Sequence, residues 1–376
     1  MTMSLITLTD ILAARDRIAS IAVRTPLVQL SRERLSAAGF ADLADTAPEI
    51  YLKDESAQPI KSFKLRGAYN KIAQLSPEQL KRGVITYSSG NHAQGVAYSA
   101  RALGGKAVIV MPSNSPQIKI DATRALGAEI VTVGSASTER KLKAEELAAA
   151  HGYTIIPPYD DPAIIAGQAT CGLEILEQLP EVDLVLSPVS GGGLLSGVAT
   201  GIKLAAKPGG PFIARAGVPG ERSLLDGVAM RDEWGRTNAH APLVYGCEPE
   251  LAGDSKESFY LKTLVEWPAE KTTRTLCDGL RTQSLGQRNF EHILQFVDGI
   301  VTVTEDEIRT ALKIMLAATD IVPEPSGAVT LAAALFHTRE FPGIGPASKI
   351  AAIVSGGNLD PALRTQLESE SAATPV

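Results

Sequence analysis

The chain has 376 residues, an apolar fraction of 44% and a formal net charge of −6. This length allows one large domain or two smaller ones, and the composition is typical of a globular enzyme with a substantial core. Because the charge is negative and no basic block stands out, we expect a small-molecule partner and no nucleic acid.

Neither membrane insertion nor secretion is expected. The longest apolar runs, such as residues 108–111, have the length of a strand and are far too short to cross a bilayer. Residues 1–10 have neither a basic start nor a long apolar run, so we expect a cytoplasmic protein. Three widely separated cysteines, Cys171, Cys247 and Cys277, favour buried thiols over disulfides or zinc ligands.

From residue 83 to about 160, short apolar runs alternate with longer segments of helical period. This pattern predicts successive βα units and a parallel sheet. We expect strands over 84–87, 106–111 and 129–133, followed by helices over 93–103, 118–126 and 138–150. Glycines that can adopt a left-handed conformation stand just past these helices, at Gly104-Gly105, Gly127 and Gly152.

A second series of elements follows. The pattern predicts helices over 164–179 and 194–206, and strands over 184–186, 243–247, 299–304 and 350–354. Residues 207–242 are rich in glycine, proline and charge and are longer than a compact connection needs. A surface elaboration is favoured over a lid or a subunit contact for this segment.

A glycine-rich loop, Gly191-Gly192-Gly193, follows one predicted strand and opens the helix that starts at Leu194. Backbone N–H groups and a helix N-terminus converge there, which is the arrangement that binds a phosphate group best. Ser190 begins the loop and could add a hydroxyl hydrogen bond. A flexible glycine linker is the alternative that the strand–loop–helix context disfavours.

A lysine stands among apolar neighbours in Ser62-Phe63-Lys64. An aliphatic amine becomes a nucleophile where burial lowers its pKa, and Ile60 and Phe63 fit such a pocket. Most single lysines are surface groups, so this interpretation depends on the other motifs.

Two further motifs complete the pattern. Ser88-Ser89-Gly90-Asn91-His92 lies at a strand-to-helix turn, where its hydroxyl, amide and N–H groups can bind polar ligand atoms, although helix capping explains it equally well. Ser355-Gly356-Gly357-Asn358 follows the last strand and offers a hydroxyl group. Together the four motifs supply a lysine for an aldehyde, an amide for a phenolic oxygen, a phosphate loop and a hydroxyl for a ring nitrogen, which is what pyridoxal 5'-phosphate requires.

The combination resembles the fold type II family of pyridoxal phosphate enzymes, in the branch of threonine dehydratases, serine dehydratases and serine racemases. The resemblance covers nearly the whole chain, from Arg24-Thr25-Pro26-Leu27 through Lys53-Asp54-Glu55 and residues 62–68 to Ser355-Gly356-Gly357-Asn358. It implies an α/β fold similar to the tryptophan synthase β subunit, with two open, mostly parallel sheets flanked by helices. A large domain of residues 1–82 and 161–376 would carry an inserted small domain of residues 83–160. The resemblance also implies a homodimer.

The resemblance assigns the cofactor contacts to Phe63, Lys64, Asn91, Ser190, Gly191, Gly192, Gly193, Leu194 and Ser355. Catalysis falls to Lys64, as the general base at Cα, and to Ser89 on the opposite side of the cofactor. The substrate contacts are assigned to Ser88, Ser89, Asn91, His92 and Arg140. We expect water and ammonia to be removed from a β-hydroxy amino acid such as L-threonine or L-serine, which gives a 2-oxo acid.

In serine racemases and related dehydratases, a loop matching residues 248–254 holds Mg²⁺ or Ca²⁺. The ligands here would be Glu248, the Ala252 carbonyl and Asp254, and oxygen ligands suit these hard cations. Gly253 replaces an acidic residue that is common in that motif, and a solvated acidic loop is the alternative.

Other functions stay open. Arg140 could favour a distal carboxylate, as in a 3-hydroxyaspartate dehydratase, because guanidinium matches carboxylate geometry. Ser89 could support serine racemisation. A β-replacement enzyme or a non-catalytic binding protein fits less well, because the asparagine loop of cysteine synthase usually reads differently and Lys64 is intact. Only 18 residues follow Asn358, so we do not expect the isoleucine-sensing domain of biosynthetic threonine dehydratases.

Overall fold

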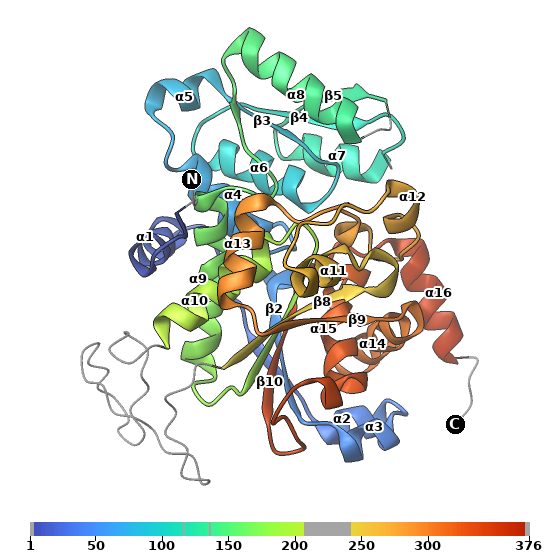
Figure 1. The fold of residues 1–376 in the computed structure, drawn as a ribbon. Coiled ribbons are helices and arrows are strands. Elements are labelled where there is room, and N and C mark those ends of the chain that lie inside the picture. The colour runs from blue at the N-terminus through green and yellow to red at the C-terminus, as the bar shows by residue number, and fades with distance from the viewer. Residues whose placement is uncertain (1–3, 116, 135–136, 207–241, 373–376) are drawn as a thin grey trace.

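The computed structural model describes residues 4–115, 117–134, 137–206 and 242–372. Two β-sheets, each flanked by helices, form the framework, and the smaller sheet stands above the larger one in Figure 1. In the part of the chain that the structure describes, no helix has the length and hydropathy that a membrane crossing requires.

The larger sheet has six strands in the order β1-β2-β10-β7-β8-β9. Its strands are β1 (Leu27–Leu30), β2 (Glu49–Asp54), β7 (Leu184–Pro188), β8 (Leu243–Pro249), β9 (Gly299–Val303) and β10 (Lys349–Val354). Strand β1 pairs antiparallel with β2, and all other pairs are parallel. The central strands read as continuous apolar runs because helices cover both faces of the sheet.

Successive side chains of these strands enter two different cores, as the alternation of a strand requires. Leu184 and Leu186 pack toward α14 and α15, whereas Val185 packs toward α9, α10 and α13 on the other face. The helices around this sheet are α1 (Leu8–Ile18), α2 (Arg32–Ala37), α3 (Ala41–Thr46), α4 (Lys64–Ile72), α9 (Pro162–Gln178), α10 (Gly193–Ala205), α11 (Asp254–Leu261), α12 (Ala269–Thr272), α13 (Gln287–Phe296), α14 (Glu305–Ala318), α15 (Pro325–Phe336) and α16 (Pro361–Ala372).

The smaller sheet has four parallel strands in the order β5-β4-β3-β6. These are β3 (Val84–Tyr87), β4 (Ala107–Pro112), β5 (Glu129–Val133) and β6 (Thr154–Ile155), and the accompanying helices are α5 (Pro77–Arg82), α6 (Asn91–Ala102), α7 (Gln117–Ala125) and α8 (Ser137–His151). Val84 and Ile109 share a core with α6, whereas Ile85 and Val108 pack on the opposite face toward α8.

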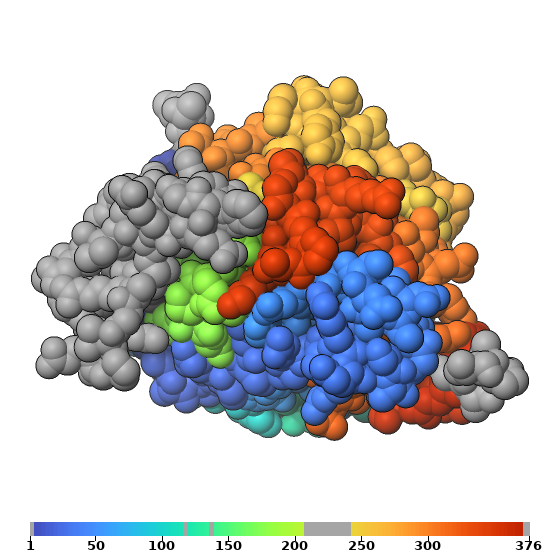
Figure 2. All heavy atoms as spheres, turned by 90° about the horizontal axis from the view of Figure 1, so that it is seen from below, coloured from blue at the N-terminus to red at the C-terminus, as the bar shows by residue number. Residues whose placement is uncertain are grey.

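Residues from the two ends of the chain lie side by side. Strand β2 pairs in parallel with β10, from Glu49↔Lys349 to Asp54↔Val354. Figure 2 shows the same neighbourhood from below, where the blue N-terminal atoms adjoin the red C-terminal ones. The Lys64 segment, which follows β2, is therefore brought next to the Ser355 segment, which follows β10.

The fold confirms the predicted class, with one refinement: the larger sheet is mixed because β1 runs antiparallel. Each strand and helix predicted between residues 84 and 206, and the three later strands, is present with ends shifted by a few residues. Gly104, Gly127 and Gly152 have positive φ values, but Gly105 does not. All three cysteines are free and buried, as expected.

The sequence patterns did not predict strands β1, β2 and β6. Segment 207–241 lies outside the described residues, so the interpretation of this insertion stays a prediction. The division into domains 1–82 with 161–376 and 83–160 also stays a prediction.

Candidate active site

The four sequence motifs lie at the carboxyl ends of parallel strands or contact a segment that does. Ser355 follows β10, Ser190 comes shortly after the neighbouring strand β7, and Ser88 follows β3 of the smaller sheet. Ser62 forms an isolated β-bridge with Gly356, and the Phe63 N–H donates to the Ser355 carbonyl at 3.1 Å. This is the edge at which open α/β sheets bind their ligands.

Helix N-termini supply much of the site. Lys64 is the first residue of α4, Asn91 of α6 and Gly193 of α10, while Glu324 stands immediately before α15. The first N–H groups of a helix lack partners within it, and the helix dipole makes that end positive. The site is therefore suited to a ligand with several negatively charged or electron-rich oxygens.

The Lys64 side chain is half-buried, and its surroundings disfavour a positive charge. Burial lowers the pKa of the amine to about 8, and the nearby Glu324 carboxyl opposes this effect. Nζ donates to the Pro158 carbonyl at 2.8 Å and lies 5.1 Å from the centre of the Phe63 ring. A substantial fraction of the amine is therefore uncharged at mildly alkaline pH, as a nucleophile or base requires.

Gly191-Gly192-Gly193 forms a tight turn into α10. Gly192 has a φ of 93°, a conformation that other residues rarely adopt. A Cβ on Gly191 would come within 2.4 Å of the Tyr159 ring, so a larger residue would not fit there. The Gly191 carbonyl accepts from the Asn289 amide at 2.6 Å, which holds the loop in place.

The two residues that flank the glycines, Ser190 and Leu194, also have contacts within the protein. The Ser190 hydroxyl lies 2.6 Å from the Thr282 hydroxyl and accepts from the Thr282 N–H at 3.2 Å, so protein groups already contact it. The Leu194 side chain is buried in the hydrophobic core, so only its backbone N–H could reach a ligand.

Tyr159 is a residue of this site that sequence reasoning missed. Its ring packs against Gly191 and its backbone against Gly193, while the carbonyl of the preceding Pro158 accepts from Lys64. Burial raises the pKa of the phenol to about 12, so it stays neutral. The only sequence signal was an aromatic residue after Pro157-Pro158, and strand β6 before it has two residues and is too short to recognise.

The serine loop after β3 is half-buried, and a Cβ on Gly90 would meet no atom within 4 Å. The Ser88 hydroxyl accepts from the Gly90 N–H at 3.3 Å. Ser89 is also half-buried in this loop. The loop therefore borders open space, which leaves room for a ligand.

Asn91 is held from both sides. Its Nδ2 donates to Glu324 Oε1 at 2.7 Å, and its Oδ1 accepts from Asn358 Nδ2 at 2.7 Å. Glu324 is a second residue that the motifs did not identify. Burial, and then the charge of Asp278, raise the pKa of the Glu324 carboxyl to about 7.

His92 occupies a different position from the one its predicted role suggests. The ring is 3% exposed, and Nε2 lies 3.0 Å from the Ile156 carbonyl. Burial, and then the nearby Lys64 amine, lower the pKa of the imidazole to about 3. His92 is therefore a neutral core group, and this geometry gives no support to a contact with substrate.

Ser355 is buried beside the Lys64 segment, and its hydroxyl donates to the Ser326 carbonyl at 3.4 Å. Arg140 is half-buried on α8, its Nε has no hydrogen-bond partner among the described residues, and burial lowers the pKa of its guanidinium. No hydrogen bond or ion pair within the described ranges joins Arg140 to Lys64 or to the glycine loop.

Glu248 and Asp254 form a buried acidic pair at the end of β8. Glu248 Oε1 accepts from the Lys256 N–H at 2.7 Å, but Glu248 Oε2 and Asp254 Oδ2 have no partner among the described residues. Burial, and then repulsion by Asp254, raise the pKa of Glu248; burial raises that of Asp254 to about 7. No third His, Cys, Asp or Glu joins them in any metal-binding group that the described residues contain.

A buried network of charges fixes helix α4 behind the site. Arg66 donates to both oxygens of Glu55, at 2.7 and 2.8 Å, and to both oxygens of Glu174, at 2.7 and 2.9 Å. Lys53 Nζ donates to Glu174 at 2.6 Å. Lys53 belongs to β2, Glu55 directly follows it, Arg66 belongs to α4 and Glu174 belongs to α9. The network therefore holds the helix that begins at Lys64 against the larger sheet.

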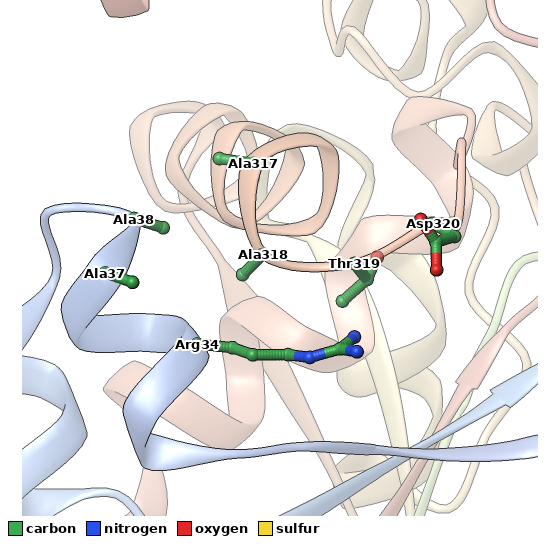
Figure 3. A pocket seen from close by; sticks show the side chains of 7 residues that line it. All are labelled: Arg34, Ala37, Ala38, Ala317, Ala318, Thr319 and Asp320. Atoms are coloured by element: carbon green, nitrogen blue, oxygen red, sulfur yellow. The ribbon is translucent and has the colours of Figure 1, made fainter.

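A separate pocket of about 290 Å³ lies between α2 and the end of α14. Figure 3 shows the Arg34 side chain extending from α2 below Ala318 and Thr319. None of the residues lining it belongs to the four motifs, so it is a different feature from the site around Lys64.

Comparisons with known proteins identify the family to which the chain is similar. The sequence profile described as "Pyridoxal-phosphate dependent enzyme" matches residues 18–356. The L-threo-3-hydroxyaspartate ammonia-lyase of Saccharomyces cerevisiae is 36% identical over 353 residues, which cover 93% of each chain. The serine racemase of Schizosaccharomyces pombe is 35% identical over 351 residues, 93% of this chain and 94% of the other.

Further relatives have similar names. A catabolic L-threonine dehydratase of Staphylococcus aureus is 36% identical over 359 residues, 96% of this chain and 91% of its own. Among solved structures, maize serine racemase has a TM-score of 0.80 at 31% identity and covers 98% of each chain. The threonine deaminase of tomato, Solanum lycopersicum, in its processed isoform 2, has a TM-score of 0.78 at 35% identity, covering 97% of this chain and 87% of that one.

Proposed function

The chain belongs to the family of pyridoxal-phosphate dependent enzymes, and from that premise we propose that it is an ammonia-lyase that dehydrates a β-hydroxy amino acid. The substrate would be of the L-threonine or L-serine type, and the products a 2-oxo acid and ammonia. The names of the yeast and Staphylococcus aureus relatives support this class of reaction.

The residues present fit the cofactor. The N–H groups of Gly191, Gly192, Gly193 and Leu194 would hold the phosphate at the start of α10. Asn91 would donate to the phenolic oxygen, and Ser355 would bond to the ring nitrogen. The Phe63 ring, whose centre lies 5.1 Å from Lys64 Nζ, would line the cofactor site. The Ser190 hydroxyl contacts Thr282 and, when Thr282 is the donor in that contact, would keep its own O–H for the phosphate.

One observation carries the proposal. Two consecutive residues, Pro158 and Tyr159, contact the Lys64 amine and the glycine loop, respectively. Because these two residues are adjacent in the chain, one short segment contacts both the Lys64 amine and the glycine loop. A ligand with an aldehyde at one end and a phosphate at the other would bring these two groups into one site.

Pyridoxal phosphate, when bound, supplies an electron-withdrawing ring that accepts the negative charge left when a proton leaves Cα. The chain provides the proton transfer itself. Once the substrate amine has displaced it from the cofactor, Lys64 would remove the Cα proton as a general base, and burial favours its neutral form. The N–H and hydroxyl groups of Ser88, Ser89 and Asn91 hold the substrate carboxylate, and the apolar Phe63 ring limits access of water.

The test is an assay of purified protein with L-threonine, L-serine and L-threo-3-hydroxyaspartate, in which 2-oxo acid and ammonia are both measured. We expect both products from at least one substrate and none after Lys64→Ala. Lys71→Ala is the matched control, because Lys71 lies on the same helix but pairs with Asp161. Absence of oxo acid from all three substrates would overturn the proposal.

Two alternative activities, dehydration of 3-hydroxyaspartate and racemisation of serine, are each supported by one observation. The unpartnered Nε of Arg140 could meet the distal carboxylate of 3-hydroxyaspartate, so Arg140→Ala would raise KM for that substrate and not for L-serine. Ser89 borders the open space at Gly90, so a proton delivered by its hydroxyl would produce D-serine. Ser89→Ala would then stop D-serine formation while elimination continues.

We also propose a Mg²⁺ or Ca²⁺ site at Glu248, the Ala252 carbonyl and Asp254. The two unpartnered, buried carboxylate oxygens support it, because a cation would satisfy both. The division into domains of residues 1–82 with 161–376 and of residues 83–160 is also proposed, and it is supported by the separate smaller sheet, whose strands all lie between residues 84 and 155. A homodimer in the cytoplasm completes the proposal.

A further inference from the structure

The amide of Asn91 is fixed by two residues, Glu324 and Asn358, that are not among the proposed cofactor contacts. Glu324 accepts from Asn91 Nδ2, and Asn358 donates to Asn91 Oδ1, each at 2.7 Å. An –NH₂ group cannot accept, so the Asn358 amide nitrogen requires the oxygen of Asn91 on its side and leaves the Asn91 nitrogen facing Glu324. Asn358 is itself held in place by a 3.2 Å bond from its Nδ2 to the Ile60 carbonyl.

Glu324 lies where the lysine segment and the last-strand segment meet. Its N–H donates to the Gly356 carbonyl at 2.9 Å, and Gly356 bridges to Ser62. A Cβ on Gly356 would come within 2.6 Å of Glu324 Oε1 and 3.1 Å of Asn91 Nδ2. Only glycine at position 356 therefore leaves enough space for the Glu324 carboxyl to contact the Asn91 amide.

Burial of the Glu324 carboxyl has a free-energy cost. Glu324 is 5% exposed, and no ion pair in the described part of the chain includes it. Asp278, Lys119 and Lys64 act on it only through longer-range electrostatics. A buried carboxyl without an ionic partner is unfavourable to folding, and such groups concentrate at functional sites.

We propose that Glu324 and Asn358 are positioning residues, which orient the Asn91 amide so that its second N–H points at the phenolic oxygen of the cofactor. An amide nitrogen carries two N–H groups, and Glu324 uses one of them. The other is free to donate to the ligand. This inference rests on the proposed function, because it requires the cofactor to lie against Asn91.

The test is a double-mutant cycle on the affinity for pyridoxal phosphate, with Glu324→Ala, Asn91→Ala and the double variant. Each single change is expected to weaken binding roughly tenfold, the effect of losing a buried hydrogen bond. Because Glu324 acts through Asn91, the double variant should bind no more weakly than Asn91→Ala. Multiplicative losses in the double variant would overturn the proposal.

A second readout is the absorption spectrum of the bound cofactor, which responds to the donor at the phenolic oxygen. Glu324→Ala and Asn358→Ala should shift the absorption maximum in the same direction as Asn91→Ala. Glu324→Gln keeps an acceptor for Asn91 Nδ2 and should restore the wild-type spectrum. Unshifted spectra in both alanine variants would contradict the proposal even if they fold less stably.

The control is Glu307→Ala, which removes a carboxylate that pairs with His337 away from this site. It should leave both the affinity and the spectrum unchanged. If the wild-type chain binds no pyridoxal phosphate, the proposed function fails. If the wild type binds it and the cycle is multiplicative, only the positioning role fails.

Discussion

The Lys64 amine lies in surroundings that favour its neutral form. Burial is the largest cause, and the Glu324 carboxyl acts in the opposite direction, so the pKa falls from its usual value to about 8. In the sequence, the only sign of a lowered pKa at Lys64 was the presence of the apolar neighbours Ile60 and Phe63. The contact with Pro158 could not be predicted, because it comes from a segment 94 residues away.

The pH dependence of cofactor capture follows from this pKa. Only the neutral amine attacks an aldehyde, so the rate of covalent attachment of pyridoxal phosphate to the cofactor-free protein should rise with pH and level off near about 8. An unperturbed lysine would level off only above about 10.4. Stopped-flow absorbance over the neutral to alkaline range measures the profile. If the rate still rises at pH values well above 8, the amine is not in surroundings that favour its neutral form.

The carboxylates of Glu248 and Asp254 predict stabilisation by a divalent cation. Their unpartnered oxygens are buried, so a bound ion would remove an unfavourable repulsion. At a free concentration a hundredfold above Kd, the gain is about 2.7 kcal/mol. Thermal melting with Ca²⁺ or Mg²⁺ against a chelator checks this expectation. An equal shift of the melting temperature in the Glu248→Gln variant would show that the ion binds elsewhere.

At the scale of elements, the glycine loop owes its shape to backbone conformation as well as to composition. Gly192→Ala places a Cβ on a residue with a φ of 93° and within 2.8 Å of the Asn289 Cβ. The left-handed conformation costs about 1–2 kcal/mol, so affinity for pyridoxal phosphate should fall roughly tenfold or more. Titration of the cofactor-free protein measures the loss.

Gly343→Ala is the matched control for this change. Gly343 also has a positive φ, of 76°, but a Cβ there would meet no atom within 4 Å. It should lower the melting temperature and leave cofactor affinity unchanged. Equal losses of affinity in the two variants would show that general destabilisation, and not the loop, is responsible.

The network around Arg66 supports helix α4 from behind. Arg66→Met removes the ion pair of Glu55 and leaves Glu174 paired with Lys53 alone, and breaking a buried pair in this way costs about 3–5 kcal/mol. Chemical denaturation should therefore show a large loss of stability. Arg364→Met, which removes a pair exposed at the surface, should cost less than about 1 kcal/mol. Similar losses in both variants would mean that the network contributes little.

At the scale of the whole molecule, the order of elements was predictable because most strands and helices here have strong periodicity and glycine boundaries. Strand β6 has two residues, too short for a periodic signal. The antiparallel pairing of β1 with β2 depends on contacts between segments, which a local pattern does not contain.

Some residues of the candidate site were likewise predictable from the sequence, and others were not. Lys64, Asn91, Gly191 and Ser355 stand in local motifs and could be identified from the sequence. Tyr159 and Glu324 enter the site only through folding, and each is flanked by residues with no distinctive pattern. His92 shows the opposite case, since its motif suggested a substrate contact and the fold buries its ring.

Identification of the modified residue tests the central claim most directly. The protein is reconstituted with pyridoxal phosphate, reduced with borohydride, digested and analysed by mass spectrometry. The account predicts that the peptide containing Lys64 carries the added pyridoxyl group and that Lys64→Ala abolishes the modification. A stoichiometric adduct on another lysine, or none in a protein that binds the cofactor, would contradict it.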